Sequence, residues 1–207
     1  MICTYKVTEW GSTNCYFLGN SQRHGFLIDP GAEGERLVRD LAAARLTVEK
    51  ILITHGHYDH IGAVPLVARA LGVPVLMRDE GRRYAENSYW NLSALADREL
   101  RLQNVTYFRG GDAIALDSDP GFAVETISAP GHTSDGTVYW SKQENAAFVG
   151  DTIFLGSRGR TDLPGGDERT IIESIRRILS VLPDSTRLYS GHSAPTRVAD
   201  EKPWYGL

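Results

Sequence analysis

The residues with the clearest chemistry are three histidines and one aspartate that fall within six consecutive positions. This segment reads His55-Gly56-His57-Tyr58-Asp59-His60, and it directly follows the apolar run Ile51-Leu52-Ile53 and Thr54. Imidazole nitrogens and carboxylate oxygens are the groups that bind zinc and related divalent ions in proteins. The chain has six histidines in 207 residues, so their concentration in one short segment indicates metal binding rather than ordinary polar residues.

The spacing within the segment suggests how it would present its ligands. Alternate residues of an extended backbone point to the same side, so we expect the rings of His55 and His57 to share one side. Asp59 and His60 follow in the turn and can point toward a second ion. The segment therefore allows two adjacent metal ions.

Three further polar residues occupy a similar context, at the end of an apolar strand and within a loop of small residues. They lie in Ala129-Pro130-Gly131-His132-Thr133, in Phe148-Val149-Gly150-Asp151-Thr152 and in Tyr189-Ser190-Gly191-His192. Singly, each signal is weak, and Asp151 alone would more often be a helix cap or a turn residue. Together with the first segment they use five of the six histidines. The sixth, His24, lies in a polar turn, and we expect it to be a solvated loop residue.

The pattern of apolar and turn residues predicts the elements that must position these side chains. Short apolar and aromatic runs bounded by glycine, proline and asparagine indicate strands, at residues 14–19, 25–29, 50–54, 73–77, 105–108, 113–116, 122–128, 136–141, 146–149 and 187–190. Apolar residues at helical spacing indicate helices at residues 33–46, 61–71 and 168–182, the last capped by Asp167. Residues 79–104 are also expected to be helical. Strands and helices in two successive groups favour an α/β fold whose sheets are covered by helices on their outer faces.

Composition and charge exclude several classes of function. With 42% hydrophobic and 23% charged residues, the chain is expected to fold as one globular domain over residues 1–207. A net charge of -4 without any run of lysine and arginine argues against nucleic acid as a partner. The N-terminus does not resemble a signal peptide, and no stretch approaches the ~18 apolar residues of a membrane span. A cytoplasmic location away from the membrane is expected.

The chain resembles the metallo-β-lactamase-fold hydrolases, and the resemblance covers essentially its whole length. It is carried by His55-Gly56-His57-Tyr58-Asp59-His60, His132, Asp151 and His192, in the order that superfamily uses. The segment Gly159-Arg160-Thr161-Asp162-Leu163-Pro164-Gly165-Gly166-Asp167 further resembles a loop of the small glyoxalase II-like, or hydroxyacylglutathione hydrolase-like, proteins. The resemblance implies a single-domain, four-layer αββα sandwich with its metal site at one edge of the two sheets.

The same resemblance implies a role for each candidate ligand. His55, His57 and His132 would bind the first metal, Asp59, His60 and His192 the second, and Asp151 would bridge the two ions. Zinc is the expected metal, with iron and manganese as alternatives. Arg160 is expected to bind an anionic substrate, or alternatively to form an ion pair with Asp162 or Asp167 that shapes the loop.

The function that the resemblance implies is hydrolysis of a small-molecule thioester by a metal-bridging hydroxide, with Asp59 orienting the hydroxide. Hydrolysis of β-lactams is not expected, because the second site lacks the cysteine of the common zinc-dependent antibiotic-degrading members and because those members lack this kind of bridging aspartate. The main alternative is a persulfide dioxygenase with one iron held by His55, His132 and Asp151. A scaffold protein with a decayed site is a third possibility, which the complete ligand set argues against.

Two departures from the glyoxalase II pattern concern the thiol half of the substrate. Full-length glyoxalase II proteins carry a C-terminal helical domain that contacts glutathione, whereas only fifteen residues follow His192 here. The usual His-Gly-Pro is replaced by His192-Ser193-Ala194-Pro195, and the ending Lys202-Pro203-Trp204-Tyr205-Gly206-Leu207 differs from the Asn-Pro-Phe type of tail. The sequence therefore leaves the thiol carrier open.

Overall fold

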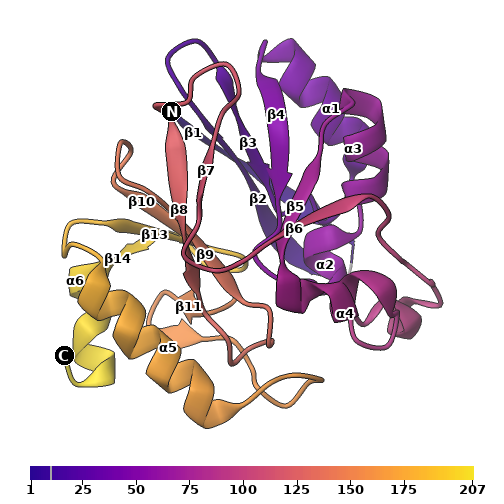
Figure 1. Ribbon diagram of the computed structural model, residues 1–207. Helices are drawn as coiled ribbons and strands as arrows, with labels where there is room; N and C mark the ends of the chain where they lie inside the picture. Colours follow the sequence, from indigo (N-terminus) through magenta and orange to yellow (C-terminus); the bar gives the residue numbers. More distant parts are fainter. Residues whose placement is uncertain (10) are drawn as a thin grey trace. The chain divides into compact units, whose positions relative to one another are not determined.

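The structure is a computed structural model that describes residues 1–9 and 11–207. It consists of two compact units, one formed by residues 1–108 and 115–123 and the other by residues 109–114 and 124–207. Each unit contains a β-sheet together with its own helices (Figure 1). The expected α/β fold, with strands and helices in two successive groups, is therefore confirmed.

The first unit is built on a six-stranded sheet. Its strands, in the order in which they lie side by side, are β1 (Ile2–Thr8), β2 (Ser12–Gly19), β3 (His24–Ile28), β4 (Thr47–Leu52), β5 (Val75–Arg78) and β6 (Val105–Phe108). The strands predicted at residues 14–19 and 25–29 are β2 and β3, which pair antiparallel, and β1 adds an antiparallel strand that the sequence pattern did not reveal. From β3 to β6 the neighbouring strands are parallel, so their carboxyl ends share one edge.

Two of the predicted helices pack on this sheet. They are α1 (Gly34–Ala43) and α3 (Val64–Leu71), which lie side by side in Figure 1. Both are amphipathic, and Leu37 and Leu41 of α1 are buried in one apolar cluster with Val64 and Val67 of α3. Strand residues such as Phe17, Leu27 and Ile51 belong to the same cluster. A short helix, α2 (Tyr58–Ile61), carries the last part of the histidine segment.

The expectation of helix over residues 79–104 is wrong, because the described structure there is mostly turn and loop. It contains η1 (Asp79–Gly81), α4 (Arg82–Glu86) and η2 (Ser93–Ala96). The buried Asn91 side chain donates to the carbonyls of Tyr84 and Leu100 and accepts from the N–H of Ser93. Such side-chain hydrogen bonds to the backbone compete with helix formation. Leu92 and Asp97 have positive φ angles, which end any helix.

The second unit is built on another six-stranded sheet. Its strands, in spatial order, are β14 (Thr196–Arg197), β13 (Arg187–Ser190), β10 (Ala146–Gly150), β9 (Thr137–Ser141), β8 (Ala123–Ser128) and β7 (Ala113–Ala115). β10 is parallel to β13 and antiparallel to β9, which is itself antiparallel to β8. The strands β8, β10 and β13 therefore run in the same direction.

One long helix, α5 (Glu168–Val181), covers this sheet. Its buried residues Ile171, Ile175 and Ile178 share an apolar cluster with Val138 and Leu188 of the sheet. Asp167 caps the helix as predicted, because its carboxylate accepts a 2.7 Å hydrogen bond from the Thr170 N–H. Five short elements described in this unit were not predicted, namely β14, the hairpin of β11 (Ile153–Phe154) and β12 (Ser157–Arg158), α6 (Val198–Glu201) and η3 (Lys202–Tyr205).

His24 corrects another expectation. It is not a solvated loop residue but the first residue of β3, where its Nδ1 lies 2.8 Å from Oε1 of Glu49. Its side chain is 35% exposed, whereas that of Glu49 is 11% exposed. The one histidine left out of the predicted metal site thus supports the sheet. Among the described residues, no helix has the length and apolar character needed to cross a membrane.

Candidate metal centre

Strand direction explains why the candidate ligands gather within each unit. In the first unit, parallel pairing places Ile28 of β3 opposite Leu52 of β4. The residues that follow these strands, Asp29 and the histidine segment, therefore emerge at the same sheet edge. In the second unit Gly150 of β10 pairs with Ser190 of β13. Asp151 and His192 follow these parallel strands, so they emerge at the same sheet edge. His132 emerges at that edge too, because it follows β8, which runs in the same direction.

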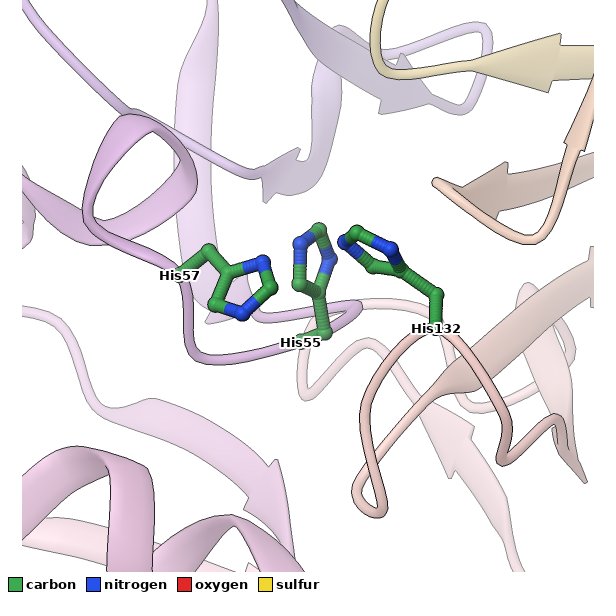
Figure 2. Close-up of side chains that lie close together, drawn as sticks. All are labelled: His55, His57 and His132. Atoms are coloured by element: carbon green, nitrogen blue, oxygen red, sulfur yellow. The ribbon is translucent and has the colours of Figure 1, made fainter. Parts of the chain in front are cut away.

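The four predicted ligands of the first unit form one group. The ring centroids of His55 and His57 are 4.9 Å apart and nearly perpendicular (Figure 2), and those of His55 and His60 are 4.1 Å apart. All three histidines are buried, whereas the Asp59 side chain is 27% exposed. Buried imidazoles beside a partly accessible carboxylate are suited to binding a cation that a molecule from solvent can still reach.

The loop of residues 79–104 supports the same histidine segment from outside. The ring of Tyr84 meets that of His57 at 6.1 Å in an edge-on arrangement, and the Tyr58 N–H donates to the carbonyl of Asn91. A Cβ atom on Gly56 would lie 2.3 Å from the Cβ of Tyr84, so only glycine permits this close approach. The segment thus positions His57 even though it is not the predicted helix.

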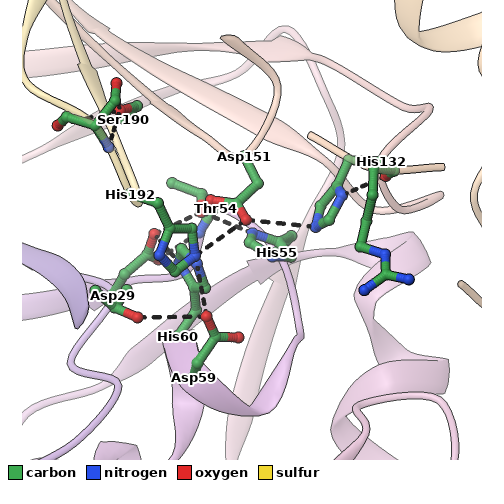
Figure 3. Close-up of polar contacts among 12 residues, drawn as sticks. Asp29, Thr54, His55, Asp59, His60, His132, Asp151, Ser190 and His192 are labelled. Carbon is green, nitrogen blue, oxygen red and sulfur yellow. Dashed lines mark hydrogen bonds and ion pairs between the residues drawn. The ribbon is translucent and has the colours of Figure 1, made fainter. Parts of the chain in front are cut away.

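A carboxylate outside the predicted ligand set holds two of these histidines. Asp29 is buried and accepts hydrogen bonds from the N–H of Thr54 at 2.8 Å, the Thr54 hydroxyl at 2.5 Å and Nδ1 of His60 at 2.9 Å (Figure 3). Since the Thr54 hydroxyl donates its proton to Asp29, its oxygen is available to accept from Nδ1 of His55 at 3.2 Å. One carboxylate therefore fixes the proton of His60 directly and that of His55 through Thr54.

This network determines which histidine atom faces the candidate ion. A neutral imidazole with a proton on Nδ1 carries its lone pair on Nε2. Nε2 of His60 lies 3.7 Å from Oδ2 of Asp59, and this oxygen also accepts a 3.3 Å hydrogen bond from the Thr13 hydroxyl. In the neutral imidazole these two atoms are both acceptors, so a cation can bind to both of them. The donor set of the first unit therefore fits a metal ion.

The second unit repeats the arrangement around Asp151. Nδ1 of His132 donates to the carbonyl of Arg160 at 2.7 Å, so its Nε2 is again the acceptor. Oδ2 of Asp151 lies 3.6 Å from Nε2 of His132 and 3.2 Å from Nε2 of His192 (Figure 3). One carboxylate oxygen between two imidazole nitrogens has the geometry expected of a carboxylate shared by cations.

The side chain of the predicted substrate residue Arg160 forms an exposed ion pair with Asp162. Its Nε and one terminal nitrogen donate to the two oxygens of Asp162, both at 2.7 Å. Hydrogen bonding from Arg160 lowers the pKa of Asp162 to about 2. The ion-pair alternative therefore accounts for the side chain, and substrate binding by Arg160 stays a prediction. The neighbouring Gly159 packs closely against Asp151, because a Cβ on Gly159 would lie 2.0 Å from the carbonyl oxygen of Asp151.

Sequence reasoning did not identify Asp29, Thr54 or the carbonyl of Arg160 as partners of the ligands. A signal for Asp29 was nevertheless present. It follows the apolar strand that ends at Ile28 and precedes Pro30-Gly31, which is the context that identified the other candidates. The carbonyl of Arg160 could not be found this way, since a backbone atom leaves no mark in residue types.

Comparison with known proteins assigns this geometry to a family. The sequence profile of the Metallo-beta-lactamase superfamily matches residues 8–192. A relative from Haemophilus influenzae named hydroxyacylglutathione hydrolase GloC is 34% identical over 196 residues, which is 91% of this chain and 89% of the relative. The expected family is therefore confirmed.

Two solved structures share the fold. A structure described as the BLEG-1 B3 metallo-beta-lactamase has a TM-score of 0.90 and 31% identity, covering 98% of this chain and 97% of its own. A protein solved in a di-iron-bound form has a TM-score of 0.83 and 29% identity, covering 95% of this chain and 96% of its own. The expected metallo-β-lactamase fold is confirmed by these similarities.

The Asp29 network predicts that Asp29→Asn weakens metal binding while the fold is retained. An asparagine amide group would face the donors of Thr54 or His60, so the orientation of both histidines would loosen. We expect metal affinity to fall about 10- to 100-fold, as for other residues that orient ligands. Titration of chelator-treated protein with zinc measures this change. Asp184→Asn, which removes an exposed carboxylate, is the matched control, and equal affinities in the two variants would contradict the role of Asp29.

The Arg160 ion pair predicts a change in the pKa of Asp162 that can be measured separately from substrate binding. In Arg160→Ala the pKa of Asp162 should rise from about 2 toward its ordinary value of 3.8, because the carboxylate loses its hydrogen-bonded cation. NMR titration of the Asp162 carboxyl carbon measures the change. If Arg160 also binds substrate, KM should rise more in this variant than in Asp162→Asn. An unchanged KM would leave Arg160 with only its structural role.

Proposed function

The chain belongs to the metallo-beta-lactamase superfamily, and we propose that this metal-dependent hydrolase acts on small-molecule thioesters. The relative named hydroxyacylglutathione hydrolase supports a thioester substrate, because the similarity extends over nearly the whole of both chains. The observation that carries the hydrolytic chemistry is the grouping of imidazole nitrogens and carboxylate oxygens around Asp59 and Asp151, which are the atoms that bind divalent metals. We expect neither nucleic acid nor a membrane as a partner.

We further propose that the candidate ligands bind two ions as the family resemblance implies. The proposed first ion takes His55, His57 and His132, and the proposed second takes Asp59, His60 and His192. Asp151 is proposed to bridge them, which agrees with its position between the Nε2 atoms of two histidines in its own unit. We propose zinc, and the relative solved in a di-iron-bound form makes iron the first alternative.

Two bound divalent cations would supply an acidified water and polarise the thioester carbonyl. The residues of the chain would have the remaining tasks. Asp59 is the proposed catalytic residue, because its carboxylate is accessible and can orient the attacking water and hold its proton. The Thr13 hydroxyl fixes the Oδ2 atom of this carboxylate. Asp29 and the Arg160 carbonyl keep protons on the Nδ1 atoms, so that Nε2 binds metal.

A second candidate activity is favoured by one comparison. The solved structure described as a B3 metallo-beta-lactamase shares 31% of its residues with this chain. This similarity makes β-lactam hydrolysis the second candidate activity. The lack of a cysteine ligand therefore does not by itself separate thioester hydrolysis from β-lactam hydrolysis. The persulfide dioxygenase alternative differs in chemistry, since it needs one iron and oxygen.

Metal analysis with a substrate panel tests the proposed function. The purified protein should contain about two equivalents of metal per chain and hydrolyse thioesters faster than a β-lactam. Glutathione, coenzyme A and carrier-protein thioesters with one acyl group form the panel. One equivalent of iron with oxygen uptake on a persulfide would instead favour the dioxygenase, and faster β-lactam hydrolysis would replace the thioesterase assignment.

The Asp59→Ala variant separates the two-metal reading from the one-iron reading. Loss of Asp59 should deplete the second metal and lower thioester turnover by orders of magnitude, because a ligand and the water-orienting group are lost together. His192→Ala should lower metal content in parallel. Metal content by mass spectrometry and circular dichroism check stoichiometry and fold. Retention of full metal content and wild-type turnover by either variant would show the dinuclear hydrolase assignment to be wrong.

A further inference from the structure

We propose that the second unit carries an apolar platform that binds an uncharged thiol group of the substrate. The platform consists of Leu155, Gly156 and Trp204, at the tip of the β11–β12 hairpin and in η3. This inference rests on the proposed thioester hydrolysis and adds the chemical class of the leaving thiol. It gives a function to the two segments in which the chain departs from the glyoxalase II pattern.

Side chains that follow His192 in the sequence hold the hairpin tip in place. The Leu155 N–H donates to the Ser193 hydroxyl oxygen at 3.0 Å, and the Gly156 N–H donates to the Glu201 carboxylate at 3.2 Å. Glu201 is only 1% exposed, and it also accepts a 2.7 Å hydrogen bond from the Thr196 hydroxyl. A buried carboxylate committed to a turn N–H fixes that turn more firmly than surface contacts could.

The fixed tip presents apolar surface to solvent. Leu155 is 56% exposed and Trp204 is 70% exposed, so both contribute apolar surface at the hairpin tip. The indole lies beside the tip, because a Cβ on Gly156 would be 3.8 Å from Cζ2 of Trp204. An exposed tryptophan on a rigid support provides a large contact area at a small cost in conformational entropy.

The hairpin connects this surface to a proposed metal ligand. The ring of Phe154 meets that of His192 edge-on, with centroids 6.0 Å apart. Leu155 is the next residue in the chain, so the platform begins one residue beyond a ring that contacts His192. In the proposed reaction the thiolate leaves from the carbonyl that the metal ions polarise. In the proposed binding mode a substituent on the sulfur lies along the hairpin, toward Leu155 and Trp204.

The charges near the platform favour an uncharged substituent. Arg158 of the hairpin pairs with Glu168, and Lys202 of η3 pairs with Asp184. Arg176 donates from Nε to the carbonyl of Tyr205. Arg158 and Lys202 are thus paired with carboxylates, whereas glutathione carries two carboxylates that need cations of their own. The apolar surface instead matches a thiol arm without charge.

Thioesters with one 2-hydroxyacyl group and two different thiols test the proposal. One is the thioester of N-acetylcysteamine, which is uncharged, and the other is that of glutathione. Trp204→Ala should raise KM for the uncharged thioester about fivefold with kcat unchanged, because apolar contact area is lost away from the reacting atoms. KM for the glutathione thioester should change by less than about twofold. Leu155→Ala should act in the same direction, and Trp204→Phe should restore most of the loss.

Val181→Ala is the matched control, since Val181 is also 56% exposed but lies in the last turn of α5. Unfolding midpoints verify that the variants remain folded. Equal changes in KM for the two thioesters in Trp204→Ala, or a change in Val181→Ala as large as in Leu155→Ala, would overturn the platform. Failure of the wild-type protein to hydrolyse either thioester would instead overturn the proposed function, and the platform with it.

Discussion

The hydrogen bonds that the Asp29 carboxylate accepts impose the constraint on which the rest of the candidate site depends. A neutral imidazole has one proton and one lone pair, so fixing the proton on Nδ1 fixes the lone pair on Nε2. Asp29 does this for His60 directly and for His55 through Thr54. In the second unit the carbonyl of Arg160 does the same for His132. The presence of histidine alone would not place the lone pair on Nε2, because in the other tautomer Nε2 carries the proton and cannot bind an ion.

Strand direction explains how residues distant in the sequence come under this constraint. Asp29 follows β3 and the histidine segment follows β4, and these strands are parallel neighbours in the first unit. Parallel strands end at a common edge, where polar groups can meet without burying unpaired backbone. In the second unit the parallel pair of β10 and β13 brings Asp151 and His192 to one edge in the same way. Each unit therefore assembles its ligands by the topology of its own sheet.

The sequence was most informative where function and local pattern coincide. His55, His132, Asp151 and His192 could be singled out because each ends a short apolar run, and the long helix α5 could be predicted from its isoleucine stripe. Residues 79–104 could not, since Asn91 uses side-chain hydrogen bonds to the carbonyls of Tyr84 and Leu100 that no periodicity reveals. The partner of His132 is a backbone oxygen, and the buried Glu201 acts through turn N–H groups. Such contacts depend on the folded path of the chain rather than on residue type.

The opposed acceptors also link metal binding to stability within each unit. Nε2 of His60 faces Oδ2 of Asp59, and Oδ2 of Asp151 faces the Nε2 atoms of His132 and His192. A cation that binds these atoms only in the folded arrangement stabilises the fold by mass action, by about 2.7 kcal/mol at a metal concentration 100 times its Kd. The orienting carboxylate and the strand ends prepare this arrangement, because they fix the imidazole rings before an ion binds. Metal binding and the stability of each unit are therefore coupled through the same hydrogen bonds.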